Sequence, residues 1–148
     1  MRFIFVDEIL DLAPGDHILA SKTMRAEEDV FRDHFPGFPV VPGVLLTEMM
    51  AQTAGKCLDA ERKPRGKAML VGITKASFRE WMNPGETAVI SAVIGSSRDQ
   101  YATASCSVEV NGRKICSAEL FFSFVPLEKF ASSYRDEVLE SYFSKTRT

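Results

Sequence analysis

Residues 33–55 read DHFPGFPVVPGVLLTEMMAQTAG, a loop rich in proline and glycine that runs directly into an apolar segment. Proline fixes the backbone φ angle, so the three prolines of this loop predict a stiff connection. The loop begins at His34, and the apolar segment that follows is interrupted by the carboxylate of Glu48. A rigid loop with a histidine beside a helix with a buried glutamate predicts a site for acid–base chemistry.

Length and composition indicate one ordinary globular domain. The chain has 148 residues, of which 45% are hydrophobic and 26% are charged, and its formal net charge is −2. A chain of this size can bury about two-thirds of the surface that its unfolded form exposes. The charge gives no reason to expect nucleic acid as a partner, and the apolar runs are too short for a membrane span or a secretory signal.

The three cysteines, Cys57, Cys106 and Cys116, are odd in number and form no CxxC pair. This usage argues against a disulfide framework and predicts a reducing, cytoplasmic location. Only His17 and His34 could join them around a metal ion, and the spacing matches no zinc site. We therefore expect no metal.

Turn signals and alternating apolar residues predict an antiparallel sheet. Asn-Gly between two alternating runs is the strongest short-range hairpin signal, and it occurs at residues 111–112. The predicted strand segments are 8–24 (a hairpin with its turn at 14–16), 68–79, 86–95 and 101–125 (a hairpin about 111–112).

Three helical segments are predicted. Residues 26–31 form a short turn, and residues 42–59 form a long helix that proline and glycine end shortly afterwards. Phe130, Tyr134, Val138 and Tyr142 recur at helical spacing and predict a C-terminal helix. We expect one α+β unit with a body over residues 1–125 and a helical extension over residues 126–148.

The long helix is apolar nearly all round, as is usual for a helix buried on every side. Glu48, Gln52 and Lys56 nevertheless follow one another at four-residue intervals, along one stripe. A carboxylate in such a place is costly to desolvate unless it carries a proton or pairs with a cation. A purely structural ion pair between Glu48 and a lysine or arginine of a neighbouring strand is therefore an alternative to a catalytic role.

A lone histidine beside a loop is more often structural than catalytic, but His34 lies close in sequence to Gly43. Gly43 falls in the first turn of the long helix, where an amide lacks an intrahelical acceptor and the helix dipole is positive. Without a side chain, this position admits a carbonyl oxygen closely. Together, a base, an amide donor and an acid in one segment predict a site that stabilises an oxyanion.

The segments HFPGFPVVPGVLLTEMMAQTAG (residues 34–55) and MLVGITKASFREWMNPGE (residues 69–86) resemble the 3-hydroxyacyl-[acyl-carrier-protein] dehydratases. The match extends over residues 6–125. It is closer to the FabZ type than to the FabA type, which usually carries aspartate at the position of Glu48. The resemblance implies the hot-dog fold, a long central helix wrapped by a curled antiparallel sheet, in a homodimer that could assemble further.

The resemblance also implies roles. His34 and Glu48 would be the catalytic pair, contributed by different subunits, while the Gly43 amide would hold the thioester carbonyl and Gln52 would orient the acid. The reaction would remove water from a 3-hydroxyacyl chain on acyl carrier protein, giving the trans-2-enoyl thioester for fatty acid or related lipid synthesis. No cofactor is implied. Whether Glu48 donates the proton or only positions a water stays open.

The acyl chain needs an apolar tunnel, and the acidic carrier protein needs a basic docking surface. The candidate tunnel residues, of types more often found in plain core, are Phe35, Phe38, Val44, Met49, Ile73, Phe78 and Trp81. The candidate docking residues, which otherwise form an ordinary solvated surface, are Arg62, Lys63, Arg65 and Lys67 in one cluster and Lys75 and Arg79 in another.

Two departures from the family pattern point to a specialised relative. Asp33 stands where the family usually has glycine, and the tail after residue 125 is longer than the common family end. Two other classes remain as alternatives: a hot-dog acyl thioesterase, and a non-catalytic acyl-thioester binding protein. Isomerisation of the enoyl product is less expected with glutamate at position 48.

Overall fold

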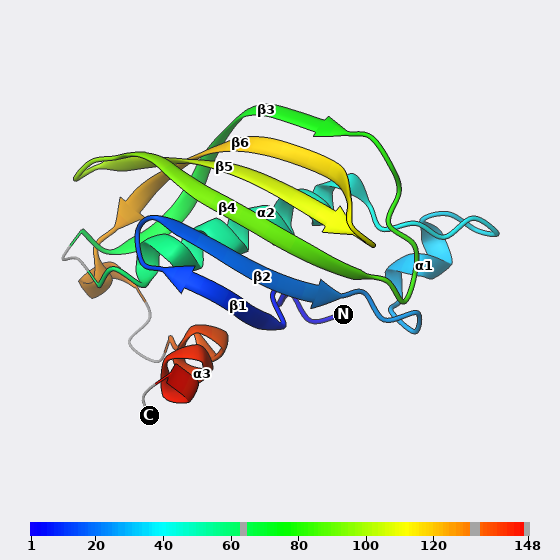
Figure 1. The fold of residues 1–148 in the computed structure, drawn as a ribbon, viewed down its shortest axis with the longest axis horizontal. Coiled ribbons are helices and arrows are strands. Elements are labelled where there is room, and N and C mark those ends of the chain that lie inside the picture. The colour runs from blue at the N-terminus through cyan, green and yellow to red at the C-terminus, as the bar shows by residue number, and fades with distance from the viewer. Residues whose placement is uncertain (63–64, 131–133, 147–148) are drawn as a thin grey trace.

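The computed structural model describes residues 1–62, 65–130 and 134–146, and it shows one antiparallel sheet curled around a long helix (Figure 1). The strand order is β1-β2-β4-β5-β6-β3, so β1 and β3 form the two edges. The strands are β1 (Glu8–Ala13), β2 (His17–Thr23), β3 (Lys67–Phe78), β4 (Thr87–Ser97), β5 (Tyr101–Val110) and β6 (Arg113–Val125).

Both predicted hairpins are confirmed. β1 and β2 pair antiparallel about residues 14–16, and β5 and β6 pair with Val110 opposite Arg113. Asn111 and Gly112 have φ angles of 53° and 78°, the left-handed conformation that a two-residue hairpin turn requires.

The long helix α2 (Gly43–Asp59) runs along the concave face of the sheet, with Pro42 as its N-cap (Figure 1). The short helix α1 (Val30–Asp33) begins later than the predicted turn at residues 26–31. After β6 come a single 3-10 turn, η1 (Leu127–Lys129), and a helix, α3 (Glu137–Thr146), which lies near β1.

The C-terminal helix is shorter than the spacing of aromatic residues predicted. Phe130 is extended and Tyr134 precedes the helix, although their rings still meet edge to face at 5.0 Å. Asp136 explains the later start, because its carboxylate accepts a hydrogen bond of 3.1 Å from the amide of Leu139. An aspartate in this position satisfies an amide that has no intrahelical acceptor.

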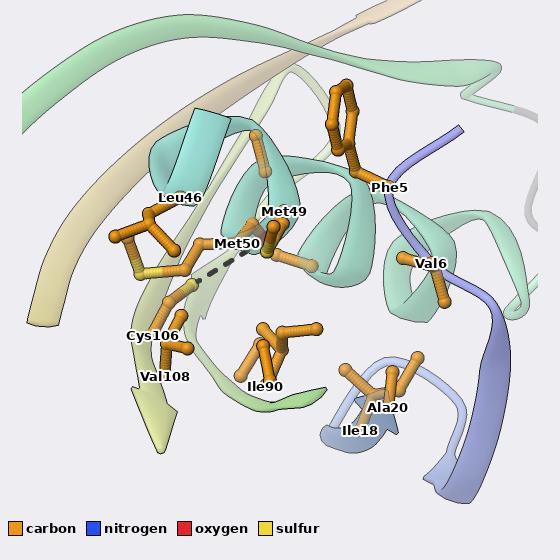
Figure 2. Packing of buried hydrophobic residues seen from close by; sticks show 14 of the residues in the cluster. Phe5, Val6, Ile18, Ala20, Leu46, Met49, Met50, Ile90, Cys106 and Val108 are labelled. Atoms are coloured by element: carbon orange, nitrogen blue, oxygen red, sulfur yellow. Dashed lines mark hydrogen bonds between the residues drawn. The ribbon is translucent and has the colours of Figure 1, made fainter. Parts of the chain in front are cut away.

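The core lies between α2 and the sheet, and Figure 2 shows part of it. Met49 and Met50 are fully buried, as is Ile90 of β4 beneath them. The expectation that α2 is buried on every side is wrong for one stripe: Val44 is 75% exposed, Glu48 and Gln52 are half-buried, and the Lys56 side chain keeps 12% exposure. This stripe faces away from the sheet's core, which leaves polar side chains of the helix accessible.

The three cysteines are buried and unpaired. Burial raises the pKa of the Cys57 and Cys116 thiols to about 11 and that of Cys106 to about 12. Across the described residues, every helix falls short of the length and apolarity that a membrane crossing needs.

Candidate active site

The loop that leads into α2 is held by its own backbone hydrogen bonds. The amides of Phe35 and Phe38 donate to each other's carbonyls at 3.0 and 2.8 Å, which closes a tight turn. The amide of Val40 donates to the His34 carbonyl at 3.0 Å, and the His34–Phe35 peptide bond is cis. These contacts agree with the stiff loop expected from the prolines.

The imidazole of His34 is oriented through one of its two ring nitrogens. Nδ1 lies 3.2 Å from the carbonyl oxygen of Val40. A carbonyl only accepts, so we assign the ring proton to Nδ1, which leaves the lone pair of Nε2 for a proton from substrate. The ring stacks on Phe35 at 4.0 Å, while Asp33, the departure from the family pattern, is exposed.

Gly43 begins α2 and presents its amide at the helix start. The amides of Leu45 and Leu46 donate to the Pro42 carbonyl, whereas the Gly43 amide has no acceptor among the described residues. A Cβ at position 43 would lie 3.3 Å from the ring of Phe78. The position therefore combines the positive end of the helix with a narrow space, as an oxyanion site requires.

Gln52 fixes the carboxylate of Glu48. Its Nε2 donates to Glu48 Oε1 at 3.0 Å and to the Phe3 carbonyl at 3.2 Å, and its Oε1 accepts from the Phe5 amide at 2.9 Å. These three bonds also assign the nitrogen and the oxygen of the Gln52 side-chain amide, because two partners accept and one donates. Within the described residues Glu48 forms no ion pair, so the structural alternative of pairing with a basic strand residue lacks its partner.

A cavity of about 600 Å³ lies beside Glu48 and Gln52. Its walls come from α2, from the N-terminal residues Phe3 and Ile4, from Met69 and Leu70 of β3, and from residues 134–138. The wall residues outside α2 were missed in the sequence, because no local pattern indicates that both ends of the chain meet at one helix.

Within one chain, the described residues show no hydrogen bond or ion pair between His34 and Glu48. His34 is also absent from the described walls of the cavity beside Glu48. Each half of the expected catalytic pair is thus ordered by separate contacts: Val40 for the histidine and Gln52 for the glutamate.

Six of the seven candidate tunnel residues are exposed, whereas Met49 belongs to the core. Phe38 and Trp81 meet edge to face at 4.9 Å, and Phe78 lies against Gly43. None of the seven is among the described residues that line the cavity beside Glu48. The exposed members are Phe35, Phe38, Val44, Ile73, Phe78 and Trp81.

The first candidate docking cluster is largely engaged within the chain. Arg65 pairs with Glu61 and Lys67 with Asp59, all four with mostly buried side chains, and Arg62 lies over the ring of Phe143. Lys63 lies outside the described residues.

The second cluster is different, because Lys75 and Arg79 are both exposed on either side of Phe78. Among the residues that the structure describes, no group of three or more His, Cys, Asp or Glu side chains could hold a metal ion.

The sheet wrapped around a central helix defines a hot-dog fold protein, and solved structures support that class. The dehydratase heterocomplex ApeI:P from Xenorhabdus doucetiae superposes with a TM-score of 0.69 at 16% identity, over 88% of this chain and 91% of that chain. A mutant of the fluoroacetyl-CoA-specific thioesterase FlK superposes with a TM-score of 0.65 at 16% identity, over 81% of this chain and 93% of that chain. The hot-dog fold expected from the sequence is confirmed.

The sequence assigns the family within that fold. The FabA-like domain matches residues 1–119, and the chain belongs to this family. Curated relatives named 3-hydroxyacyl-[acyl-carrier-protein] dehydratase FabZ include one from Oenococcus oeni, 37% identical over 80% of this chain and 86% of its own length. Another, from Listeria welshimeri, is 34% identical over 86% of this chain and 89% of its own length.

Proposed function

We propose that this protein is a 3-hydroxyacyl-[acyl-carrier-protein] dehydratase, which removes water to give the trans-2-enoyl thioester in fatty acid biosynthesis. The observation that carries the proposal is the orientation of His34, whose Nε2 is left for substrate, on a rigid loop that leads to the Gly43 amide at the start of α2. The FabZ relatives support the same reaction and the same carrier.

The chemistry assigns one role to each group. His34 Nε2 takes the proton from the Cα of the substrate, while the thioester oxygen gains negative charge and is stabilised by the Gly43 amide. Glu48 donates a proton to the departing hydroxyl, so that water leaves, and Gln52 holds its carboxyl group in place. A division in which His34 moves the proton and Glu48 positions a water uses the same contacts.

The two halves of the site belong, in this proposal, to different subunits of a homodimer. β3 is an edge strand whose large apolar side chains include Val71 (59% exposed) and Ile73 (49% exposed). An exposed apolar edge strand favours pairing with another copy. Such pairing would cover this surface and supply the glutamate that each His34 does not meet in its own described chain.

The carrier protein is the macromolecular partner in this proposal. Arg79 is exposed and directly follows Phe78, which lies against Gly43, and the exposed Lys75 lies three residues earlier on the same strand, so both positive charges are on the strand that leads to the thioester site. Charge of this kind steers an acidic partner. The exposed apolar residues around the loop would line the entrance for the acyl chain, and the three buried thiols suit a reducing cytoplasm.

The test follows enoyl-thioester absorbance with a short 3-hydroxyacyl carrier-protein substrate, with free thiol assayed in the same reaction. We expect enoyl formation without thiol release, reduced by about 10²- to 10⁴-fold in His34→Ala and in Glu48→Gln. Thiol release without enoyl formation would instead identify a thioesterase. Tight carrier binding without either product would identify a binding protein.

A further inference from the structure

The segment after the family core forms one wall of the cavity beside Glu48. The FabA-like match ends at residue 119, whereas residues 134–138 line the cavity together with residues 67–70 of β3. This part of the wall therefore lies outside the matched family region, in the same cavity as the carboxylate that the proposed reaction uses.

One ion pair fastens the segment to α2. The Nζ of Lys56 lies 2.7 and 2.9 Å from the two carboxylate oxygens of Asp136, and both side chains are almost buried, at 12% and 11% exposure. Asp136 also caps α3 through Leu139, so the same carboxylate fixes both the helix start and the wall. Breaking such a pair from one side leaves an uncompensated buried charge.

The cavity follows the stripe along α2, because its lining includes helix residues from Glu48 to Lys56. Lys56 follows Glu48 by eight residues, about 12 Å along the helix at roughly 1.5 Å per residue. An extended hydrocarbon chain with bonds of about 1.5 Å advances roughly 1.25 Å per carbon. The space between the reacting carboxylate and the ion pair therefore holds at most roughly ten carbons.

The cavity walls combine apolar and charged groups. Phe3, Ile4 and Leu70 are apolar, whereas Arg2 and Lys67 are charged, and the end of the α2 stripe adds the Lys56–Asp136 ion pair. A longer chain would have to push methylene groups into this charged end and desolvate it, which is unfavourable.

From these observations we propose that residues 134–138, held by the Lys56–Asp136 pair, close the cavity and limit the length of the acyl chain. The inference rests on the dehydratase function proposed above and adds the substrate class: short to medium 3-hydroxyacyl thioesters. The tail acts by excluding long chains and leaves the chemistry at His34 and Glu48 unchanged.

The test measures kcat/KM of the full chain for carrier-bound 3-hydroxyacyl thioesters from about four to about sixteen carbons. Asp136→Lys places like charges together and should release the wall. The double variant Lys56→Asp with Asp136→Lys restores an ion pair with its charges exchanged. Glu140→Lys reverses a charge on an exposed residue of the same tail that does not line this cavity, and it serves as the matched control.

We expect the parent to lose activity steeply on the longest chains. Asp136→Lys should raise the ratio of long-chain to short-chain kcat/KM by about tenfold or more. Glu140→Lys and the double variant should keep the parent's ratio, and circular dichroism should show that each variant is folded. Both Asp136→Lys and the double variant lack the aspartate that caps α3. If the double variant nevertheless recovers the parent's ratio, the effect of Asp136→Lys comes from the broken ion pair and not from the lost cap.

An unchanged length profile in a folded, active Asp136→Lys would overturn the inference and leave the dehydratase function intact. A parent that processes all chain lengths equally would also overturn it. Failure of the parent to form enoyl product at any length would remove the proposed function and, with it, this inference.

Discussion

In the proposed site, the residue type at the helix start, Gly43, would decide whether the thioester can bind. The Gly43 amide lacks an acceptor among the described residues, and the nearest side chain, Phe78, leaves 3.3 Å for a Cβ. Alanine would keep the amide and would suit the helix, but its methyl group would occupy the space through which a thioester carbonyl must approach. A substitution at this position should therefore lower activity without lowering the stability of the fold.

We predict that Gly43→Ala lowers kcat/KM by about 10- to 100-fold, because the oxyanion contact is lost. Its free energy of unfolding should stay within about 1 kcal/mol of the parent. The comparison is with Gly72→Ala on β3, where a Cβ would meet only Phe121 at an ordinary 3.5 Å among the described residues. Steady-state kinetics and urea unfolding of both variants give the answer, and near-parental activity in Gly43→Ala would show that a thioester carbonyl does not approach through the space that the methyl group fills.

At the scale of elements, α3 depends on contacts far away in the sequence. Among its described residues only Leu139 is buried, while Val138, Tyr142 and Phe143 pack against the core partly buried. Lys56, on α2, supplies the ion pair to Asp136 just before the helix. Elements with few buried contacts open locally at low free energy, and this pair is a polar restraint on such opening.

We predict that Lys56→Met raises the amide hydrogen exchange of α3 by about tenfold or more, because Asp136 loses the cation that it pairs with. Exchange in β4 and β5, at the centre of the sheet, should not change. Lys145→Met, in the last and exposed turn of α3, is the matched control. Equal α3 exchange in the parent and in Lys56→Met would mean that the ion pair does not hold the helix.

These elements also show what the sequence could and could not reveal. The β5–β6 hairpin was predictable, because the signal at residues 111–112 is local and needs no other part of the chain. The spacing of Glu48 and Gln52 likewise predicted neighbours on one helix face, and their hydrogen bond confirms it.

The late start of α3 and the walls of the cavity were not predictable in this way. Asp136 pairs with a lysine 80 positions earlier, and Gln52 bonds to Phe3 and Phe5, which are 49 and 47 positions away. Local periodicity carries no information about such pairs, because they form only when the sheet has brought distant segments to the same helix. The family resemblance ended before the tail and was silent there for the same reason.

The molecule as a whole buries three thiols that the proposed reaction does not use. Burial raises the pKa of Cys106 to about 12 and that of Cys57 to about 11, above the ordinary value near 8.5 that applies in the unfolded chain. The folded state thus holds these protons more tightly. This contribution to stability is complete below the unfolded pKa and is lost as the pH rises toward the folded values.

We predict that the free energy of unfolding falls between about pH 9 and pH 11, by up to about 1.4 kcal/mol per pH unit for each thiol. Cys106→Ala removes one of these thiols, so the free energy of unfolding of the variant should depend less steeply on pH. The small cavity left by the substitution lowers stability as well, but that loss does not change the slope. Urea unfolding at several alkaline pH values measures both slopes. Identical slopes would show that this thiol does not contribute to the alkaline limit, since lysine and tyrosine titrate in both proteins.

The proposed division of the site between subunits leads to a prediction for the whole molecule. His34→Ala and Glu48→Gln should each be inactive alone, but a mixed dimer would combine the intact His34 of one chain with the intact Glu48 of the other. After mild dissociation and reassociation at equal amounts, about half of the dimers are mixed, and each has one complete site of two. Activity should then recover to about one quarter of the parent's.

If His34 and Glu48 act within one chain, every site in the mixture contains a defect and no activity returns. Mixing each variant with itself controls for the dissociation step. Sedimentation of the same samples shows whether dimers have reformed, so that lack of recovery in a dimeric mixture would exclude the shared site. Recovery would explain why the histidine and the glutamate are each ordered by separate contacts and form no hydrogen bond with each other in the described chain. Pairing of two copies through β3 would then complete the site.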